Sequence, residues 1–200
     1  GGSLIDGSLI DGPNGQEMAD RVMAAAGQVA EADRLLGGLP GLLALDRDPG
    51  LAGRITAALA DAPGRIAALE ARLGDQSETA GAVEAVNAAL VDLRDAVWAV
   101  TRDRLGTHAG VRSLCSPRTV PSDAGLGVLL SIQQALSAID RLEVRGRDSA
   151  GLQVTVWNHG IDQDDPEVVA RSADPLYRSG SVRVLDGGGL AFVVKASAEI

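Results

Sequence analysis

The residues with the clearest chemical content lie in one short segment, Arg141 to Gly151, which contains Arg145, Gly146, Asp148 and Ser149. An arginine between a helix and a strand places a guanidinium where the chain reverses, and the small residues after it allow close approach of the backbone. Such a guanidinium needs carboxylate or carbonyl partners. Two interpretations remain open: Arg145 organises a binding pocket, or Arg145 and Asp148 only stabilise this corner.

A helix and a strand are predicted on either side of this segment. Ser122 is a suitable N-cap for a helix over 123–142. Its predicted buried face consists of Val128, Ile132, Ala135 and Ile139. After the segment, apolar residues alternate with polar ones from Leu152 to Val156, which predicts a strand.

The rest of the second half predicts a loop, a short helix and a β-hairpin. The acidic run at 162–165 and Pro166 predict a loop and a short helix through Arg171. Two alternating apolar segments flank Asp186-Gly187-Gly188-Gly189, which predicts a β-hairpin. A phosphate cradle at these glycines is the alternative, but no helix or lysine follows them, so we favour a plain turn.

The first half predicts helices. Residues 1–14 repeat Gly-Ser-Leu-Ile-Asp and read as a flexible lead-in. Residues 15–105 contain three amphipathic segments, separated by Gly37-Gly38 with Pro40 and by Gly74, and the second segment is broken or kinked at Pro63-Gly64. They predict an antiparallel helical hairpin or three-helix bundle, with the last helix from about Ser77 to Leu105 and Trp98 in its packing. We expect an irregular linker over 106–121.

Composition narrows the classes of function. The chain has 200 residues, 46% hydrophobic and 2% aromatic, with a formal net charge of −9. The Lys and Arg residues are scattered among more numerous acidic residues, which excludes the basic surface that a nucleic-acid-binding protein needs. We see neither a membrane-spanning run nor a signal peptide, so we expect a soluble, cytoplasmic protein with no membrane partner. One cysteine and two histidines predict no disulfide, no structural metal and no cofactor.

The Arg141–Gly151 segment resembles Leu-Glu-Tyr-Arg-Gly-Tyr-Asp-Ser-Ala-Gly of the glucosamine-6-phosphate synthase family, the isomerising class II glutamine amidotransferases. The match is contiguous at Leu142-Glu143, at Arg145-Gly146 and from Asp148 to Gly151. The resemblance implies that 122–200 is a partial glutamine amidotransferase type 2 domain. The expected fold class is therefore α+β: a partial N-terminal-nucleophile (αββα) glutaminase domain with an inserted antiparallel helical bundle.

The resemblance also implies an activity. In that family an N-terminal cysteine attacks the glutamine amide, its α-amine serves as the base, and ammonia passes to a sugar-phosphate isomerase (SIS) domain that acts on fructose 6-phosphate. It implies that Arg145 lies beside the nucleophile in a supporting role, and that Gly146, Asp148 and Ser149 belong to the substrate-binding pocket. Glutamine, a sugar phosphate, the remaining amidotransferase and SIS domains, and a second subunit in a homodimer are the expected partners.

The sequence departs from the family in several places. Val144 and Arg147 replace the aromatic residues that flank Arg-Gly, and the Cys-Gly-Ile start, the His-Thr-Arg-Trp-Ala segment and the His-Asn-Gly oxyanion element are missing. Asn158-His159-Gly160 has the last element's residues in another order and is interpreted as a loop. We therefore expect a fragment that is inactive alone. A non-catalytic helical interaction or oligomerisation module on a decayed amidotransferase-like scaffold is the alternative.

Cys115 is the one thiol that could serve as nucleophile. It lies about 30 residues before Arg145, an interval comparable with the family's, but the chain would have to be cleaved before it to free its amine. Pro117 and Pro121 follow, and proline cannot donate to a central strand ladder. We therefore expect an inert or partly buried thiol.

Overall fold

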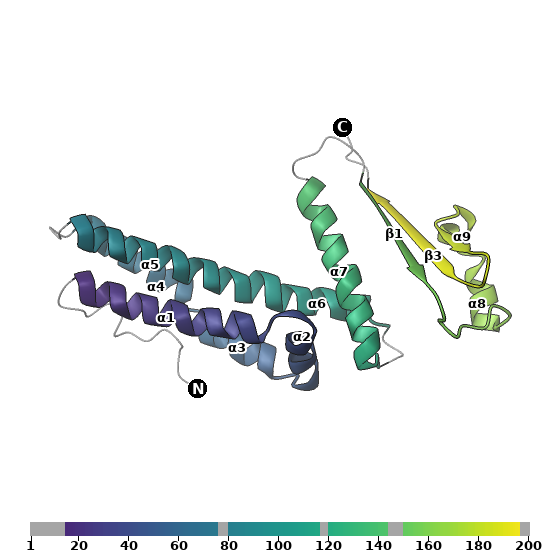
Figure 1. Ribbon diagram of the computed structural model, residues 1–200, viewed down its shortest axis with the longest axis horizontal. Coiled ribbons are helices and arrows are strands. Elements are labelled where there is room, and N and C mark those ends of the chain that lie inside the picture. Colours follow the sequence, from purple (N-terminus) through teal and green to yellow (C-terminus); the bar gives the residue numbers. More distant parts are fainter. Residues whose placement is uncertain (1–14, 76–79, 117–119, 144–149, 197–200) are drawn as a thin grey trace. The chain divides into compact units, whose positions relative to one another are not determined.

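The computed structural model describes residues 15–75, 80–116, 120–143 and 150–196 (Figure 1). The chain forms two compact units, Gly1–Leu130 and Ser131–Ile200. The first is helical, and the second contains a three-stranded antiparallel sheet. The fold is thus mixed and mostly helical with a small sheet, which is compatible with the predicted α+β class.

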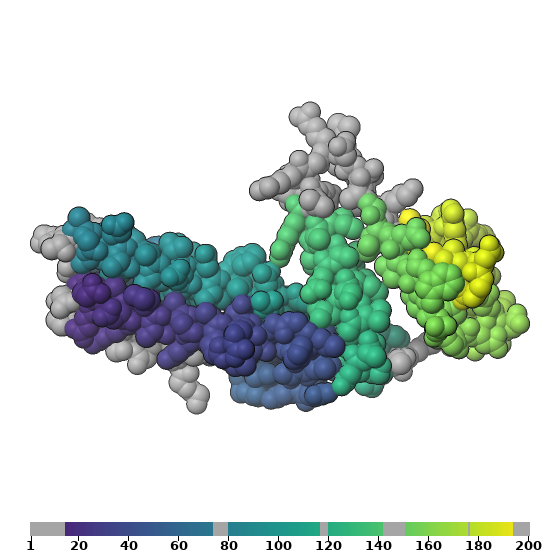
Figure 2. Space-filling model, viewed as in Figure 1, coloured from purple at the N-terminus to yellow at the C-terminus, as the bar shows by residue number. Residues whose placement is uncertain are grey.

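Seven helices begin in the described part of the first unit, and the last of them, α7, ends in the second. They are α1 (Gly15–Leu35), α2 (Gly38–Arg47), α3 (Leu51–Leu59), α4 (Ala62–Asp75), α5 (Ala80–Trp98), α6 (Leu105–Leu114) and α7 (Asp123–Glu143). A π-helical turn, Ala99–Arg104, joins α5 to α6 without a break. In the ribbon, α1 and α5 run side by side in the same direction, and the space-filling view shows them in contact along their length (Figures 1 and 2).

The core of the first unit is built from small aliphatic side chains, as predicted. The fully buried positions include Val22 and Val29 of α1, Leu69 of α4, and Leu90 and Leu93 of α5. Burying one such side chain stabilises the fold by about 1.5–3 kcal/mol, so these stripes explain why the three segments pack together. The chain returns through α3 and α4 from the end of α1 to the start of α5, so the arrangement is up, down, up (Figure 1).

Glycines and prolines that were predicted to end helices also begin them. Gly38 has a positive φ of 63°, ends the α1 region and starts α2, with Pro40 in the first turn of that helix. Likewise, the second segment breaks after Leu59, and Pro63 lies in the first turn of α4. Proline is tolerated there because the first turn has no i−4 acceptor for its missing N–H.

The predicted irregular linker is wrong for 106–114, which is helical. The buried Val111 of α6 packs with Leu42 of α2 and with Leu126 and Leu130 of α7, and this cluster gives the helix a partner. Gly106 faces open space and is accommodated at the modest cost of a helical glycine.

The helix predicted from Ser122 is confirmed, but its predicted buried face is wrong at Val128, and the other three positions of that face are only partly buried. The Ser122 hydroxyl accepts a hydrogen bond from the N–H of Gly125 at 3.1 Å. Leu126 and Leu130 are the buried residues, whereas Val128 is 54% exposed. The two stripes lie on opposite sides of one helix, and the position of α2 and α6 decides which of them is covered.

The second unit confirms the predicted strands and hairpin. Strands β1 (Ala150–Val156), β2 (Val182–Val184) and β3 (Leu190–Ala196) form an antiparallel sheet in the order β1-β3-β2. Gly187 and Gly188 both have positive φ in the turn between β2 and β3, which explains the glycine run. Helices α8 (Pro166–Arg171) and α9 (Pro175–Arg178) fill the connection after β1.

Candidate functional site

The four residues predicted to form the amidotransferase pocket lie outside the described residues. They are Arg145, Gly146, Asp148 and Ser149. The elements on either side of them are described: α7 ends at Glu143 and β1 begins at Ala150. The helix and strand expected around the segment are therefore present.

Cys115 is partly buried at the C-terminal end of α6, as expected. Its Sγ donates a hydrogen bond to the carbonyl oxygen of Val111 at 3.4 Å and packs against the small cluster around Leu42. Among the described residues, no group of three or more His, Cys, Asp or Glu side chains is placed to hold a metal ion. Within the same residues, no helix combines the length and the apolarity needed to cross a bilayer.

The loop Asn158-His159-Gly160 has a structural role. The N–H of Ile161 donates to Nδ1 of His159 at 3.0 Å, so Nε2 carries the proton and donates to the carbonyl oxygen of Gly188 at 2.8 Å. Beside it, the Trp157 ring covers Gly189, where an added Cβ would lie 2.6 Å from the ring. The histidine thus ties the loop after β1 to the hairpin turn.

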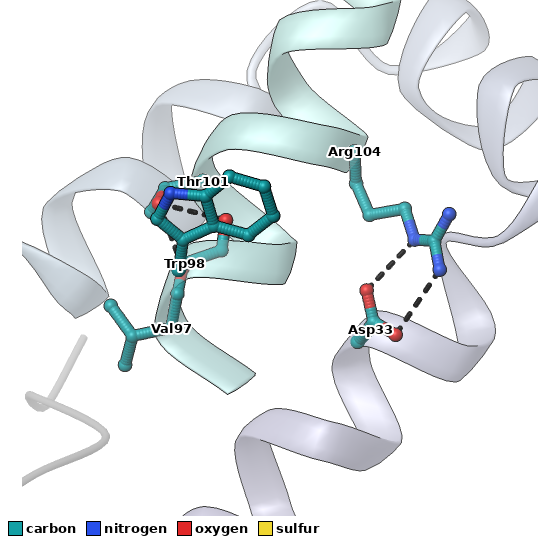
Figure 3. Close-up of polar contacts among 5 residues, drawn as sticks. All are labelled: Asp33, Val97, Trp98, Thr101 and Arg104. Carbon is teal, nitrogen blue, oxygen red and sulfur yellow. Dashed lines mark hydrogen bonds and ion pairs between the residues drawn. The ribbon is translucent and has the colours of Figure 1, made fainter. Parts of the chain in front are cut away.

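The π-helical turn at Ala99–Arg104 was not predicted from the sequence. In this turn the N–H of Leu105 donates to the carbonyl oxygen of Val100, five residues back, and the Thr101 hydroxyl donates to the carbonyl oxygen of Val97 at 2.7 Å (Figure 3). Single π turns inside α-helices are frequent at functional sites. The prediction that Trp98 is packed is wrong, because its side chain is 52% exposed.

Arg104, at the end of the π turn, binds Asp33 of α1 with two hydrogen bonds. Nε and one terminal nitrogen of Arg104 donate to the two carboxylate oxygens of Asp33 at 2.8 and 3.2 Å (Figure 3). Both side chains are partly buried, and the paired geometry is the strong form of an arginine–carboxylate contact. No local sequence signal could have found this pair, since its members belong to different helices.

A groove of about 550 Å³ runs between α1 and α5 beside this ion pair. Its walls are mostly small and apolar, with three carboxylates: Met23, Ala26, Gly27, Ala30, Asp33, Asp92, Asp95, Ala96 and Ala99. Asp33 is neutralised by Arg104, so Asp92 and Asp95 supply the negative charge of the groove. The lining contains neither a nucleophile nor a base–acid pair, which makes a catalytic role for this groove unsupported.

His108 on α6 has a perturbed proton affinity. Burial lowers the pKa of His108 below the usual histidine value; Asp46 opposes this and Arg112 adds to it. The Nε2 atom is buried and has no hydrogen-bond partner among the described residues. Asp46 and Arg112 form an ion pair with each other at 3.1 Å.

Comparison with known proteins adds no relative: no family model, curated protein or solved structure matches this chain.

Proposed function

We propose that this chain is part of the glutaminase domain of a glutamine-dependent aminotransferase. In this proposal the full-length enzyme releases ammonia from glutamine for transfer to a sugar phosphate, converting fructose 6-phosphate to glucosamine 6-phosphate. The observation that carries the proposal is the Arg145-Gly146 and Asp148-to-Gly151 motif, which follows a long helix, α7, and ends in the first residues of a paired strand, β1.

The proposed chemistry assigns a supporting role to the motif. The guanidinium of Arg145 would stabilise a thiolate and the developing oxyanion nearby, because a fixed positive charge favours both anions. Gly146 would allow close approach of the substrate backbone, and Asp148 and Ser149 would supply hydrogen bonds. The nucleophilic cysteine is expected to come from sequence outside this chain, with its own α-amine as the base.

Two features of the fold support the same proposal. Strand β1 starts at the end of the motif and is paired along its length with β3. The proposed pocket residues are therefore followed in the sequence by a hydrogen-bonded, rigid strand. The first unit has its own hydrophobic core, as expected of a helical bundle inserted into an N-terminal-nucleophile glutaminase domain.

The test uses the chain joined to its native flanking sequence. Glutamine hydrolysis is measured as released glutamate for the unchanged protein, for Arg145→Ala and for a control, Arg171→Ala, on the exposed surface of α8. We expect Arg145→Ala to lower kcat/KM by about ten-fold or more, which is about 1.4 kcal/mol of transition-state stabilisation. The control should retain full activity.

Two outcomes would refute parts of the proposal. Unchanged turnover in Arg145→Ala, with thermal stability also unchanged, removes Arg145 from the pocket. Absence of glutamine hydrolysis in the joined protein, together with no labelling by a glutamine-like diazoketone, removes the glutaminase assignment. The chain of 200 residues is expected to be inactive alone.

A second candidate function is a helical interaction module on an amidotransferase-like scaffold. It is favoured by the separate core of the first unit and by large apolar side chains that stay exposed on α5. In this second candidate the amidotransferase-like scaffold is decayed and non-catalytic, so glutamine hydrolysis by the joined protein would exclude it.

A further inference from the structure

The groove between α1 and α5 has an open floor of small side chains. All its described lining residues belong to α1, to α5 and to the start of the π turn. The floor consists of Ala26, Gly27 and Ala30 of α1, Ala96 of α5 and Ala99 of the π turn. A Cβ added at Gly27 would meet no atom within 4 Å, so the space above this position is open. Small residues at such positions let the backbone of another helix come close, at interaxial distances of about 8–10 Å.

The groove has the length of a short helical segment. Met23 and Asp33 mark its two ends on α1, about 15 Å apart along the axis, which corresponds to about three helical turns. Arg104 reaches across from the π turn to Asp33 and forms the ion pair at that end (Figure 3). At the other end Met23 is 51% exposed, and its flexible thioether side chain suits a surface that adapts to an apolar partner. A groove of this kind fits an amphipathic helix that lays its apolar face between two helices.

Two carboxylates form a negative rim on α5. Asp92 and Asp95 line the groove, are exposed and lie about 4.5 Å apart along the axis. Within the part of the chain that the structure describes, no ion pair involves either of them. Asp20, exposed and one turn before Met23 on α1, adds a carboxylate just beyond that end of the groove.

The neighbouring arginines do not neutralise this rim. Four arginines of α1, α5 and the π turn form ion pairs with other carboxylates: Arg21 with Glu17, Arg34 with Glu31, Arg94 with Glu70 and Arg104 with Asp33. Arg102 lies two turns after Asp95, about 10.5 Å along the axis, and no ion pair joins the two among the described residues. The groove therefore keeps an excess of negative charge, which favours a positively charged ligand.

We infer that this groove binds a basic amphipathic helix of a partner protein. The small apolar face of that helix lies on the alanine and glycine floor, and its Lys or Arg side chains reach Asp92 and Asp95. Basic residues one turn apart on the partner match the spacing of the two carboxylates. The apolar contact supplies the affinity, and the charges select a basic helix over an acidic one. The inference does not depend on the glutaminase proposal, because it concerns a surface of the first unit only.

A second copy of this chain is a poor occupant of the groove. The chain has a formal net charge of −9, and the α5 of another copy would bring its own Asp92 and Asp95 toward the same carboxylates. Like charges brought together weaken association. A partner of different sequence is therefore favoured.

The first experiment measures the binding of two fluorescently labelled synthetic helices to the 200-residue chain by anisotropy. Both peptides have about 18 residues, which is longer than the groove, and a face of Ala and Leu. One carries Lys on its flanks, and the other carries Glu at the same positions. We expect the Lys peptide to bind at least about ten-fold more tightly than the Glu peptide. Absence of binding by the Lys peptide, or equal affinity of the two peptides, overturns the inference.

The second experiment fills the floor of the groove. Gly27→Leu places a side chain there without disturbing the fold, because the position is open and leucine favours a helix more than glycine does. We expect the Lys peptide to bind this variant about ten-fold more weakly or worse, since its backbone can no longer approach. The matched control is Gly53→Leu in α3, an equally open helical glycine outside the groove, whose affinity should stay within about two-fold. Equal affinity of the two variants overturns the inference.

The third experiment removes the rim charges. Asp92→Asn combined with Asp95→Asn should weaken binding of the Lys peptide by about ten-fold and reduce its sensitivity to salt. The control, Asp61→Asn combined with Asp140→Asn, removes the same net charge from exposed positions elsewhere and should change the affinity by less than about two-fold. Equal weakening by both pairs shows a general attraction and overturns the site. A dimer of the unchanged chain that Gly27→Leu abolishes makes a second copy the occupant and also overturns the inference.

Discussion

At the scale of single residues, His108 shows how burial perturbs a titratable group. Its Nε2 atom is shielded inside the first unit without a hydrogen-bond partner among the described residues. Burial withdraws the protonated ring from water, which is the main reason why its pKa is lowered.

We predict that His108 makes the chain less stable in acid. Above the usual histidine pKa, near about 6.5, the ring is neutral in both the folded and the unfolded chain, and protonation of His108 takes nothing from the free energy of unfolding. As the pH falls through that value the unfolded chain binds the proton first, so stability declines until the folded pKa is passed. Thermal unfolding between about pH 7.5 and pH 5 should show a smaller decline for His108→Gln than for the unchanged chain. Parallel curves would contradict this.

At the scale of elements, the π turn between α5 and α6 changes the pattern of backbone hydrogen bonds in the long helix. The change from i+4 to i+5 bonding alters the partners of the carbonyl groups at the junction. The Thr101 hydroxyl supplies a donor there, to the carbonyl oxygen of Val97, and Arg104 at the other end is bound to Asp33. The turn is thus supported by one hydroxyl and one ion pair.

We predict that Thr101→Val destabilises the first unit by about 1 kcal/mol, because the valine keeps the shape and removes the donor. In a chain of this size the melting temperature should fall by about 2–4 °C. The matched control is Thr56→Val in α3, where the hydroxyl donates to Ala52 at 2.9 Å within a regular helix. There the carbonyl already has its backbone donor, so the change should be near neutral. Equal losses in both variants would remove the special role of Thr101.

At the scale of the whole molecule, the chain has two units with separate sources of stability. The first depends on its aliphatic core, and the second on the ladder of β1, β3 and β2. The described buried positions of the first unit far outnumber those of the second, where Leu190 and Ala191 are buried.

We predict that damage to the first core leaves the sheet unaffected. Leu93 is fully buried in α5, and Leu93→Ala should cost about 2–5 kcal/mol through lost burial and the cavity left behind. Hydrogen exchange of the amides in α1, α4 and α5 should become faster, while the amides paired between β1 and β3 keep their rates. Uniform acceleration in both units would show that they unfold together.

Local physics was sufficient to predict much of this protein from its sequence. The amphipathic stripes of α1, α4 and α5, the Ser122 cap and the glycine turn before β3 all depend on residues near one another in the chain. Each follows from helical periodicity, from a side chain that satisfies its own backbone, or from the conformational freedom of glycine. The Arg145 motif was also visible in the sequence, and its proposed role stays a prediction.

Only the tertiary structure decided which surfaces are covered. The predicted buried face of α7 was wrong, the π turn was unforeseen, and Trp98 is exposed although its helix is well packed. The Asp33–Arg104 pair likewise joins residues on different helices. These features depend on which element packs where, because a helix can bury either of two apolar faces and the sequence of one helix does not say which neighbour will reach it.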